Sequence, residues 1–288
     1  MSDARIAWLN GAFVPLVDAR IPVMDRGFLF ADGVYEVTAV LDGKLIDSAS
    51  HLARLDRSAR EIGIVPPLGQ AEIEAIERAL IARNALEQGT VYLQLTRGSA
   101  ERDFLAPPDL APTLLLFTQA KDIIGSIAAE TGIAVQTVPD LRWARRDIKS
   151  VMLLAQVLAK QAAAAAGAQE AWLIEDGMVT EGASSSALIV TEAGTLVTRP
   201  LSRTILPGCT RAAILALAER DGVAVKERAF TLDEAFAARE AILTSASSFV
   251  MPIVRIDGRS IGVGAPGPIA RRLRALYIEA ARRAGGAS

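Results

Sequence analysis

The chain has only five lysines among its 288 residues, and one of them, Lys149, is separated by a single serine from a long apolar stretch, VMLLAQVLA. We expect a loop to give way to a helix at about residue 150, which places this cation at the unfavourable end of the helix dipole. Most lysines at such a place simply extend their ammonium group to water. Here the apolar stretch leaves little polar surface, and an amine kept from water is suited to Schiff-base formation with a carbonyl compound. Lys149 is therefore a candidate nucleophile.

Pyridoxal phosphate (PLP) uses such an amine, and it needs in addition a grip for its phosphate, an acidic partner for its ring nitrogen and a substrate pocket. The stretch PGCTRAAILALAER predicts a turn that leads into a helix N-terminus. The backbone N–H groups of Cys209 and Thr210, with the Thr210 hydroxyl, could hold an anion there. Small hydroxyl residues in TSASS (244–248) and Arg54 in HLARL could add to this grip. Structural roles compete: Thr210 also suits a helix N-cap, and Arg54 an exposed arginine.

Glu181 in TEGASSS follows the strand-like MVT and precedes a Gly/Ser run. It is either an exposed turn carboxylate or the acceptor that keeps a pyridine nitrogen protonated. For a substrate carboxylate, Tyr35 in DGVYEV and Arg102 in TRGSAERDF are plausible ligands, since arginine binds carboxylates through two parallel hydrogen bonds. Three other arginines compete for this role, and spacing alone does not choose among them: Arg97, Arg145 and Arg146.

Composition excludes several other chemistries. Cys209 is the only cysteine and His51 the only histidine, so an intrachain disulfide and the usual Cys/His zinc sites are excluded. We expect no bound metal. A net charge of -2 gives no bulk electrostatic case for nucleic acid. The N-terminus MSDARIAWLNG lacks a signal-peptide core, and no apolar run is long enough to span a bilayer, so we expect a cytoplasmic protein without a membrane partner.

Hairpins and amphipathic helices must position these residues. Asn-Gly or Asp-Gly turns predict hairpins in WLNGAFVPL, VYEVTAVLDGKLID, AWLIEDGMVTEG and RIDGRSIG. Helical spacing predicts helices in SASHLARLDRSAREIGI, at about 70–87 and 150–166, after PGCT, and in PIARRLRALYIEAARR. So many hairpins favour mixed or antiparallel sheets over a doubly wound parallel one, and no GxGxxG or GxxxxGK[ST] motif is present. We place a domain boundary at 121–126, between domains 1–120 and 127–288.

Six blocks of the sequence occur together in a known family. They are RGFLFADGVYEV, HLARLDRSA, LQLTRGSAERDF, DLRWARRDIKSVMLLAQVLAKQAA, VTEGASSSALIV and ILPGCTR. The chain resembles the fold-type IV PLP enzymes, which include D-amino acid aminotransferase, branched-chain aminotransferase and aminodeoxychorismate lyase. The RW..RDIKS block is most similar to the D-amino acid aminotransferases. The resemblance implies an α/β (α+β) fold, with a small N-terminal α/β domain and a larger C-terminal mixed-sheet, pseudo-barrel domain that binds PLP, and it implies a homodimer.

The resemblance also implies roles for particular residues, with D-amino acids such as D-alanine as donors and 2-oxoglutarate or pyruvate as acceptors. Lys149 would be the Schiff-base lysine and proton shuttle, and Glu181 would pair with the ring nitrogen. Tyr35 and Arg102 would form part of the trap for the substrate carboxylate. The remaining cofactor contacts would come from Arg54, Ser185, Leu206, Cys209, Thr210, Ser245 and Ala246.

The sequence departs from the family pattern at three positions. Phe104 stands where D-amino acid enzymes have a histidine, Ala246 where a threonine is frequent, and Ala187 where an asparagine is common. Phe104 leaves open a branched-chain L-aminotransferase, and an (R)-amine transaminase or aminodeoxychorismate lyase is a further alternative. Two alternatives come from other classes. One is a binding protein that has lost catalysis, and the other is a hydrolase using His51, although that histidine is better suited to a structural role near a helix start.

Overall fold

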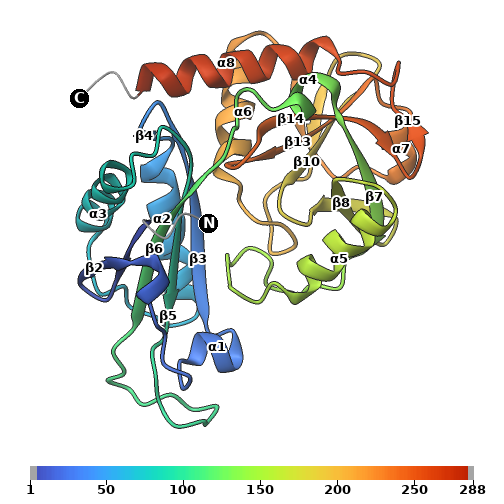
Figure 1. Cartoon of the computed structure of the whole chain (residues 1–288). Helices are drawn as coiled ribbons and strands as arrows, with labels where there is room; N and C mark the ends of the chain where they lie inside the picture. The colour runs from blue at the N-terminus through green and yellow to red at the C-terminus, as the bar shows by residue number, and fades with distance from the viewer. Residues whose placement is uncertain (1–4, 285–288) are drawn as a thin grey trace. The chain divides into compact units, whose positions relative to one another are not determined.

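The computed structural model describes residues 5–284, and their contacts divide the chain into two compact units (Figure 1). Unit 1 contains the described residues up to Asp122 and a short later segment, Ile148–Met152. Unit 2 contains Ile123–Asp147 and Leu153–Arg283. The chain thus passes from unit 1 to unit 2, returns for a few residues around Lys149, and enters unit 2 again.

Unit 1 is built on a six-stranded antiparallel sheet, in the order β2-β1-β6-β5-β3-β4. Its strands are β1 (Ile6–Leu9), β2 (Ala12–Pro15), β3 (Gly33–Leu41), β4 (Lys44–Leu45), β5 (Gln88–Thr96) and β6 (Thr113–Ala120). The Asn10-Gly11 and Asp42-Gly43 turns join β1 to β2 and β3 to β4, with the positive φ angles that such hairpins require. Both hairpins expected here from the sequence are confirmed.

Helices α2 (Ser48–Glu61) and α3 (Gln70–Arg83) pack on the unit 1 sheet, while α1 (Arg26–Phe30) and the 3₁₀ turn η1 (Leu16–Asp18) precede β3 (Figure 1). Side chains alternate across a strand, so the two faces of β3 differ. Glu36 faces the α2 side, where it contacts His51 and Arg54. Tyr35 faces the opposite side, where its ring stacks on Tyr92 at 5.8 Å between centroids.

Unit 2 is built on a nine-stranded mixed sheet, in the order β12-β11-β10-β13-β14-β7-β8-β9, with β15 paired to β14. Its strands are β7 (Ile133–Pro139), β8 (Glu170–Glu175), β9 (Met178–Gly182), β10 (Ser186–Val190), β11 (Leu196–Thr198), β12 (Val225–Glu227), β13 (Glu240–Ser245), β14 (Phe249–Ile256) and β15 (Arg259–Ser260). Only three residues separate β9 from β10, although four strands lie between them in the sheet. The sheet therefore curls into a half-barrel, and the Gly182 N–H donates to the Ser185 carbonyl at 2.7 Å across that turn.

The core of unit 2 fills one face of this curled sheet, with Trp172 and Phe230 among its fully buried side chains. A smaller apolar cluster joins the sheet to the alanine-rich helix α5 through Ala159, Ala163, Ala171, Leu173 and Ala183. The helices of unit 2 are α4 (Ile127–Thr131), α5 (Leu154–Ala165), α6 (Cys209–Arg220), α7 (Leu232–Phe236) and α8 (Pro268–Ala284).

The helices expected from the sequence are present, but some of them begin or end at other residues than predicted. The helix expected at about 70–87 ends at Arg83, and the one expected at about 150–166 begins only at Leu154. Three short helices, α1, α4 and α7, were not predicted, because each has only five residues and shows little helical periodicity. The start of α7 did carry a sequence signal, since Thr231 and Glu234 form a capping box.

Candidate active site

Lys149 belongs to the segment that returns to unit 1, not to the start of a helix. Strand β4 pairs only with Val40 and Leu41, which leaves the first half of that edge of β3 open. The returning segment pairs there: Tyr35 N–H donates to the Lys149 carbonyl at 2.9 Å, and Val151 N–H to the Gly33 carbonyl at 3.0 Å. The expectation that a helix dipole acts on Lys149 is wrong, because α5 begins only at Leu154.

The Lys149 side chain lies on the face of the sheet that carries Tyr35. Its Nζ is 4.2 Å from the centroid of the Tyr35 ring, a cation–π contact. The backbone N–H of Lys149 donates to the Ser58 hydroxyl on α2 at 3.2 Å. Two residues that were predicted separately, as nucleophile and as substrate ligand, are thus in contact within unit 1.

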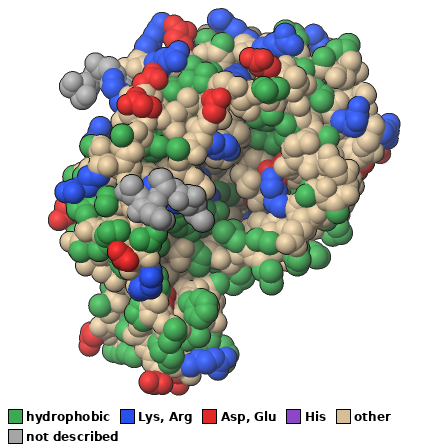
Figure 2. Space-filling view, in the orientation of Figure 1, with side chains coloured by type: hydrophobic (Ala, Val, Ile, Leu, Met, Phe, Trp, Pro, Cys, Tyr) green, Lys and Arg blue, Asp and Glu red, His purple; other side chains and the backbone are tan. Residues whose placement is uncertain are grey.

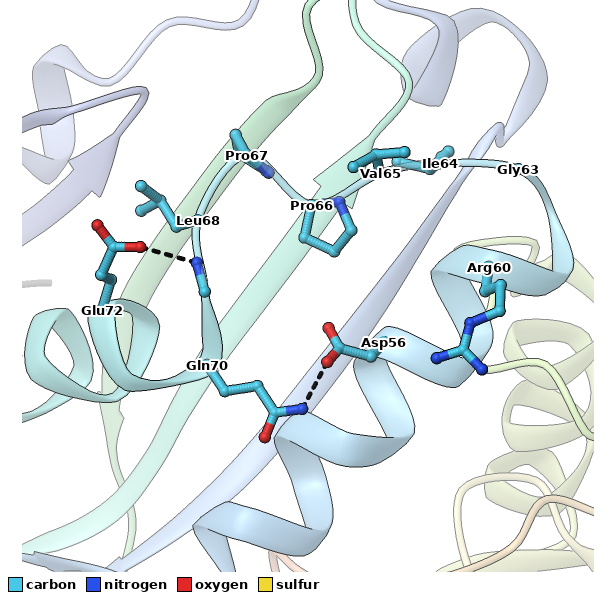
Figure 3. Close-up of a pocket in the computed structure, with 11 residues that line it drawn as sticks. Asp56, Arg60, Gly63, Ile64, Val65, Pro66, Pro67, Leu68, Gln70 and Glu72 are labelled. Carbon is cyan, nitrogen blue, oxygen red and sulfur yellow. Dashed lines mark hydrogen bonds between the residues drawn. The ribbon is translucent and has the colours of Figure 1, made fainter.

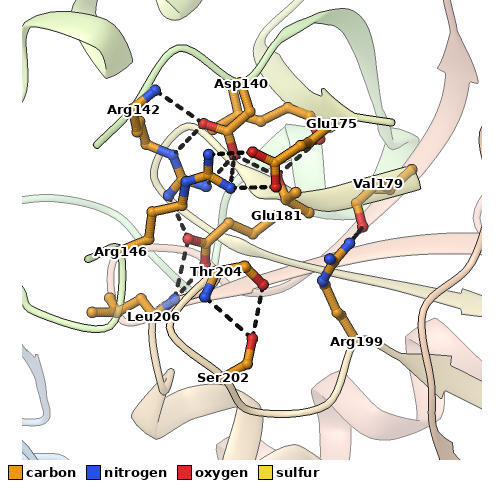
Figure 4. A network of polar contacts seen from close by, with 12 residues as sticks. Asp140, Arg142, Arg146, Glu175, Val179, Glu181, Arg199, Ser202, Thr204 and Leu206 are labelled. Atoms are coloured by element: carbon orange, nitrogen blue, oxygen red, sulfur yellow. Dashed lines mark hydrogen bonds and ion pairs between the residues drawn. The ribbon is translucent and has the colours of Figure 1, made fainter. Parts of the chain in front are cut away.

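Glu181 on β9 is at the centre of a buried network in unit 2 (Figure 4). Both of its carboxylate oxygens accept from the Leu206 N–H at 3.2 Å, and Oε1 also accepts from Arg142 Nη1. The other nitrogens of Arg142 are committed to Asp140, with Nε at 2.9 Å and Nη2 at 2.7 Å from its oxygens. Glu181 therefore shares one guanidinium with a second carboxylate.

Electrostatics distinguish the two carboxylates of this network. Burial raises the pKa of Glu181, and the charge and hydrogen bond of Arg142 do not fully offset that effect. Burial also acts on Asp140, but hydrogen bonds from Arg142 and Thr180 hold its pKa below the ordinary value. Arg146 Nη1 lies 3.3 Å from Asp140 Oδ2, and the two terminal nitrogens of Arg146 bind Glu175 at 2.8 and 2.6 Å. Within the described network, Glu181 is the carboxylate with the least compensation for its charge.

The residues expected around a phosphate in unit 2 lie on neighbouring elements. Cys209 and Thr210 begin α6, as predicted, and Gly208 is its N-cap. A Cβ at Gly208 would lie 2.7 Å from the Ser186 hydroxyl, so a side chain there would require the Ser186 side chain to move. Ser186 in turn pairs with Thr244 on β13, directly before the 245–248 segment. The N-terminus of α6 therefore lies beside β10, and the serine-rich turn follows β13, the strand that pairs with β10.

Hydroxyl groups fill this region. Ser245 Oγ bonds Ser248 Oγ at 2.6 Å, and Ser185 Oγ donates to Glu170 at 3.3 Å. Ala246 lies between the serines and offers only its backbone. Leu206 contacts Glu181 through its N–H rather than through its side chain. No sequence signal singled out Glu170, which is buried and holds the Ser184–Ser185 turn that follows Glu181.

Arg54 lies on α2 in unit 1 and is buried, contrary to the usual exposure of an arginine. Its Nε and Nη2 donate to the two oxygens of Glu36 at 2.8 and 2.7 Å, and His51 Nδ1 bonds the same carboxylate at 2.7 Å. Burial acts against the Glu36 charge, but Arg54 and His51 outweigh it and lower the Glu36 pKa to about 2. The single histidine is thus part of a structural ion cluster, as expected.

The four arginines that could bind a substrate carboxylate differ in the partners that they have in the structure. Arg97 binds Asp32 through two nitrogens and also donates to the carbonyls of Ile62 and Gly63. Arg145 binds Asp147, and Arg146 binds Glu175. Arg102 is exposed, and its described contact is with the Phe30 ring, 5.4 Å from its Cζ. Of the four, Arg102 is the one whose guanidinium has no carboxylate partner among the described residues.

Metal clusters and membrane-spanning helices are both absent from the part of the chain that the structure describes. No group of His, Cys, Asp and Glu side chains there is arranged to bind a metal ion. No helix in residues 5–284 combines the length and the apolar character needed to cross a bilayer.

A hollow of about 570 Å³ in unit 1 lies outside the predicted site (Figure 3). It is bounded by the end of α2, the Gly63–Gly69 connection and the start of α3. Gln70 donates to Asp56 across it at 2.5 Å, and Glu72 accepts from the Gly69 N–H at 2.9 Å. None of the residues predicted to act on a cofactor or substrate lines it.

Comparisons with known proteins agree with this arrangement. The sequence profile of the class IV aminotransferases matches residues 33–256. D-alanine aminotransferase of Staphylococcus aureus (strain N315) is 40% identical over 276 residues, which cover 94% of this chain and 97% of that protein. D-alanine aminotransferase of Bacillus licheniformis is 38% identical over 270 residues, covering 92% and 93% of the two chains.

Solved structures share the fold. The branched-chain aminotransferase of the archaeon Thermoproteus uzoniensis, solved with norvaline, has a TM-score of 0.85 and 26% identity, covering 96% of this chain and 94% of that one. The branched-chain enzyme from Escherichia coli has a TM-score of 0.88 at 23% identity, covering 96% and 94%, and shows likeness of fold alone. The expected fold-type IV architecture is confirmed, and the chain belongs to the class IV aminotransferases.

Proposed function

We propose that this aminotransferase uses PLP to transfer the amino group of D-amino acids, such as D-alanine, to 2-oxoglutarate or pyruvate. The geometric observation that carries the cofactor assignment is Glu181, a buried carboxylate that has only a share of one arginine. A positive charge beside Glu181 would compensate the negative charge of its carboxylate, and a protonated pyridine nitrogen supplies such a charge. The similarity to D-alanine aminotransferases along nearly the whole chain supports the D-amino acid as donor.

Residues for the rest of the cofactor are also present. The N-terminus of α6 offers backbone N–H groups and the Thr210 hydroxyl, while Ser245 ends β13 and Ala246 follows it in the turn. Ser185 would complete this group next to Glu181. Arg54 is assigned to the same phosphate, and its charge is kept in a fixed place by Glu36. Because Ala246 stands where a threonine is frequent, this chain lacks one hydroxyl contact to the phosphate, but the backbone N–H of Ala246 could still donate to it.

Bound PLP supplies an aldehyde that exchanges amines and a ring that accepts the electrons left when the substrate Cα loses its proton. The chain supplies the remaining functions. Lys149 holds the cofactor through its amine and moves the proton to and from Cα. Glu181 holds the proton on the ring nitrogen. Tyr35 and Arg102 bind the substrate carboxylate, and this fixes which hydrogen of Cα faces Lys149.

The test is the substitution Lys149→Ala. We expect it to abolish transamination and the visible absorption band of the bound cofactor, while circular dichroism of the chain stays that of the parent protein. Lys160→Ala is the matched control, because Lys160 is partly exposed and pairs with Glu170 at 3.3 Å. Retained turnover in Lys149→Ala would refute the assignment of Lys149.

A branched-chain L-amino acid is the second candidate donor, and Phe104 is the observation that favours it. Its ring is 80% exposed where D-amino acid enzymes have a polar histidine, and a less polar trap suits other substrates. Stopped-flow measurement of the cofactor spectrum after D-alanine or L-leucine is added separately decides between them. Conversion by D-alanine alone supports the proposal, and conversion by L-leucine alone overturns the stereochemistry while Lys149 and Glu181 keep their roles.

The proposal also includes a cytoplasmic homodimer, as the family resemblance implies. Sedimentation equilibrium of the full chain tests the dimer, and fractionation of the source cells tests the location. A monomer that transaminates at full rate would contradict the first part.

A further inference from the structure

The segment between β5 and β6, residues 97–112, carries Arg102 and has no helix or strand of its own. Connections of this length are usually mobile unless other groups hold them. A mobile segment would be a poor support for a residue that must bind a carboxylate in one orientation, because ordering it costs binding free energy. A residue in this role therefore needs other groups that hold its part of the segment in place.

Arg26, in the first turn of α1, holds it. This arginine is only 5% exposed. Its Nη1 donates to the carbonyl of Asp103 at 2.5 Å and its Nη2 to the carbonyl of Phe104 at 3.1 Å. Its backbone N–H donates to the Gly98 carbonyl at 2.8 Å. One buried arginine thus ties down the two residues that directly follow Arg102.

A single carboxylate joins this anchor to the start of the segment. Asp32 accepts from Arg26 Nε at 2.9 Å and from Arg97 Nε at 2.7 Å. Burial opposes the charge of Asp32, but the hydrogen bonds and charges of the two arginines hold its pKa below the ordinary value. Arg97 also donates to the carbonyls of Ile62 and Gly63, so the cluster is fixed to the end of α2.

An aromatic ring lies under both arginines. The Phe30 centroid is 4.9 Å from Arg26 Cζ and 5.4 Å from Arg102 Cζ, and the Phe104 ring packs on it at 5.5 Å. Such contacts orient a guanidinium plane even when it is exposed. Hydrophobic side chains gather on this end of unit 1, around α1 and the 97–112 segment, with both basic and acidic groups among them (Figure 2).

The helix that carries Arg26 and Phe30 is itself closely fitted to β5. Asp25 caps α1 by accepting from the Gly27 N–H at 2.8 Å, and it also accepts from Thr96 Oγ1 at 3.0 Å. A Cβ at Gly27 would lie 2.2 Å from Thr96 Cγ2, so this approach requires glycine. The stretch RGFLFAD therefore forms a rigid base beside the 97–112 segment.

We propose that Arg26 is a positioning residue that acts through Arg102: it fixes the carbonyls of Asp103 and Phe104 so that Arg102, lying over Phe30, presents its guanidinium to a substrate carboxylate. The inference rests on the proposed function, in which Arg102 binds that carboxylate. It accounts for tolerance of Phe104 at a histidine position, because Phe104 contributes its backbone carbonyl and its ring packing rather than a polar side chain.

The test is a double-substitution cycle of Arg26→Lys and Arg102→Ala in the holoenzyme. Lysine keeps the charge but loses the fork that reaches two carbonyls and Asp32. We expect Arg26→Lys to lower kcat/KM for D-alanine by about tenfold, mainly through KM, as the loss of a charged hydrogen bond implies. In the Arg102→Ala background we expect the same change to have no further effect. Arg78→Lys, a substitution in an exposed pair of unit 1, is the matched control.

Two readouts separate positioning from general damage. Hydroxylamine, a nucleophile without a carboxylate, should bleach the cofactor band at the parental rate in Arg26→Lys. Amide hydrogen exchange of residues 99–105 in the cofactor-free chain should speed up by about tenfold or more, with unchanged exchange in β3 and β5. Additive effects in the cycle, or an equal loss with hydroxylamine, would overturn the inference.

The proposed function and this inference fail in different ways. If the parent enzyme converts L-leucine and not D-alanine, the proposed donor is wrong, and the same cycle run with L-leucine supports or overturns the role of Arg26. If Arg102→Ala leaves KM unchanged for both substrates, Arg102 binds no carboxylate and the inference is overturned, although transamination stands.

Discussion

Two buried carboxylates, Glu36 in unit 1 and Glu181 in unit 2, each contact an arginine, yet their pKa values move in opposite directions. Glu36 has both of its oxygens bonded by Arg54 and one also by His51, so its charge is fully compensated within the chain. Glu181 shares Arg142 with Asp140 and otherwise accepts from a single backbone N–H. The number of cationic partners per carboxylate, rather than burial, distinguishes them.

This difference suggests how a structural ion cluster and a ligand site can be told apart. A buried carboxylate that its own cationic partners fully compensate needs no charge from a ligand, and removing one of those partners leaves an uncompensated charge. A buried carboxylate with incomplete compensation tolerates its place best when a ligand supplies the missing charge. Glu36 is of the first kind and supports Arg54, and Glu181 is of the second kind.

The largest effect on stability is expected from Glu36→Gln. It leaves the charge of the buried Arg54 without its partner, which should lower the free energy of unfolding by about 3–5 kcal/mol. Chemical denaturation of the cofactor-free chain measures this, with Arg78→Gln at an exposed pair as the control. If Glu36→Gln destabilises the chain no more than Glu181→Gln does, the proposed difference between the two carboxylates is wrong.

Glu181→Gln should show the reverse pattern. The substitution removes a poorly compensated buried charge, so the free energy of unfolding of the cofactor-free chain should change by less than about 1 kcal/mol. Loss of the partner that keeps the ring nitrogen protonated should slow proton removal from D-alanine on the order of 10²-fold. Single-turnover stopped-flow spectroscopy gives the rate. An unchanged rate would remove Glu181 from the chemistry.

A third carboxyl, Glu77 on α3, sharpens the comparison through the small change in stability that it causes over each pH unit. Burial raises its pKa to about 8, and neither oxygen has a hydrogen-bond partner of normal geometry among the described residues. The folded chain therefore holds a proton that the unfolded chain releases above its ordinary pKa of 4.5. Stability should fall as pH rises from about 4.5 to 8, by at most ~1.4 kcal/mol per pH unit.

Glu77→Gln tests this by removing the titrating group and keeping its shape. The slope of unfolding free energy against pH, measured from about 5 to about 8, should then flatten. Glu36 acts at the other end of the scale, because its lowered pKa contributes stability above pH 4.5 that is lost as pH falls toward 2. If the slope of the variant equals that of the parent, Glu77 does not titrate in this range.

Much of this protein could be read from its sequence, because the signals were local. The Asn-Gly and Asp-Gly turns, the amphipathic pattern of α2 and the turn into α6 each depend on a few neighbouring residues, and the structure has all of them. Six ordered blocks were enough to identify the family, which the comparisons confirm. The contact of Lys149 with Tyr35 was not readable, since it depends on an open edge of β3 that a distant segment fills.

Tertiary structure alone decided how charge is shared. The sequence offered Arg97, Arg102, Arg145 and Arg146 as equals, and only the fold shows that three of them already bind carboxylates. It also revealed Glu36, Asp140 and Arg142, whose partners lie up to 40 residues away along the chain. The physical reason is that hydrophobic periodicity and turn chemistry act between neighbours, whereas compensation of a buried charge depends on which distant groups the fold brings within hydrogen-bond distance.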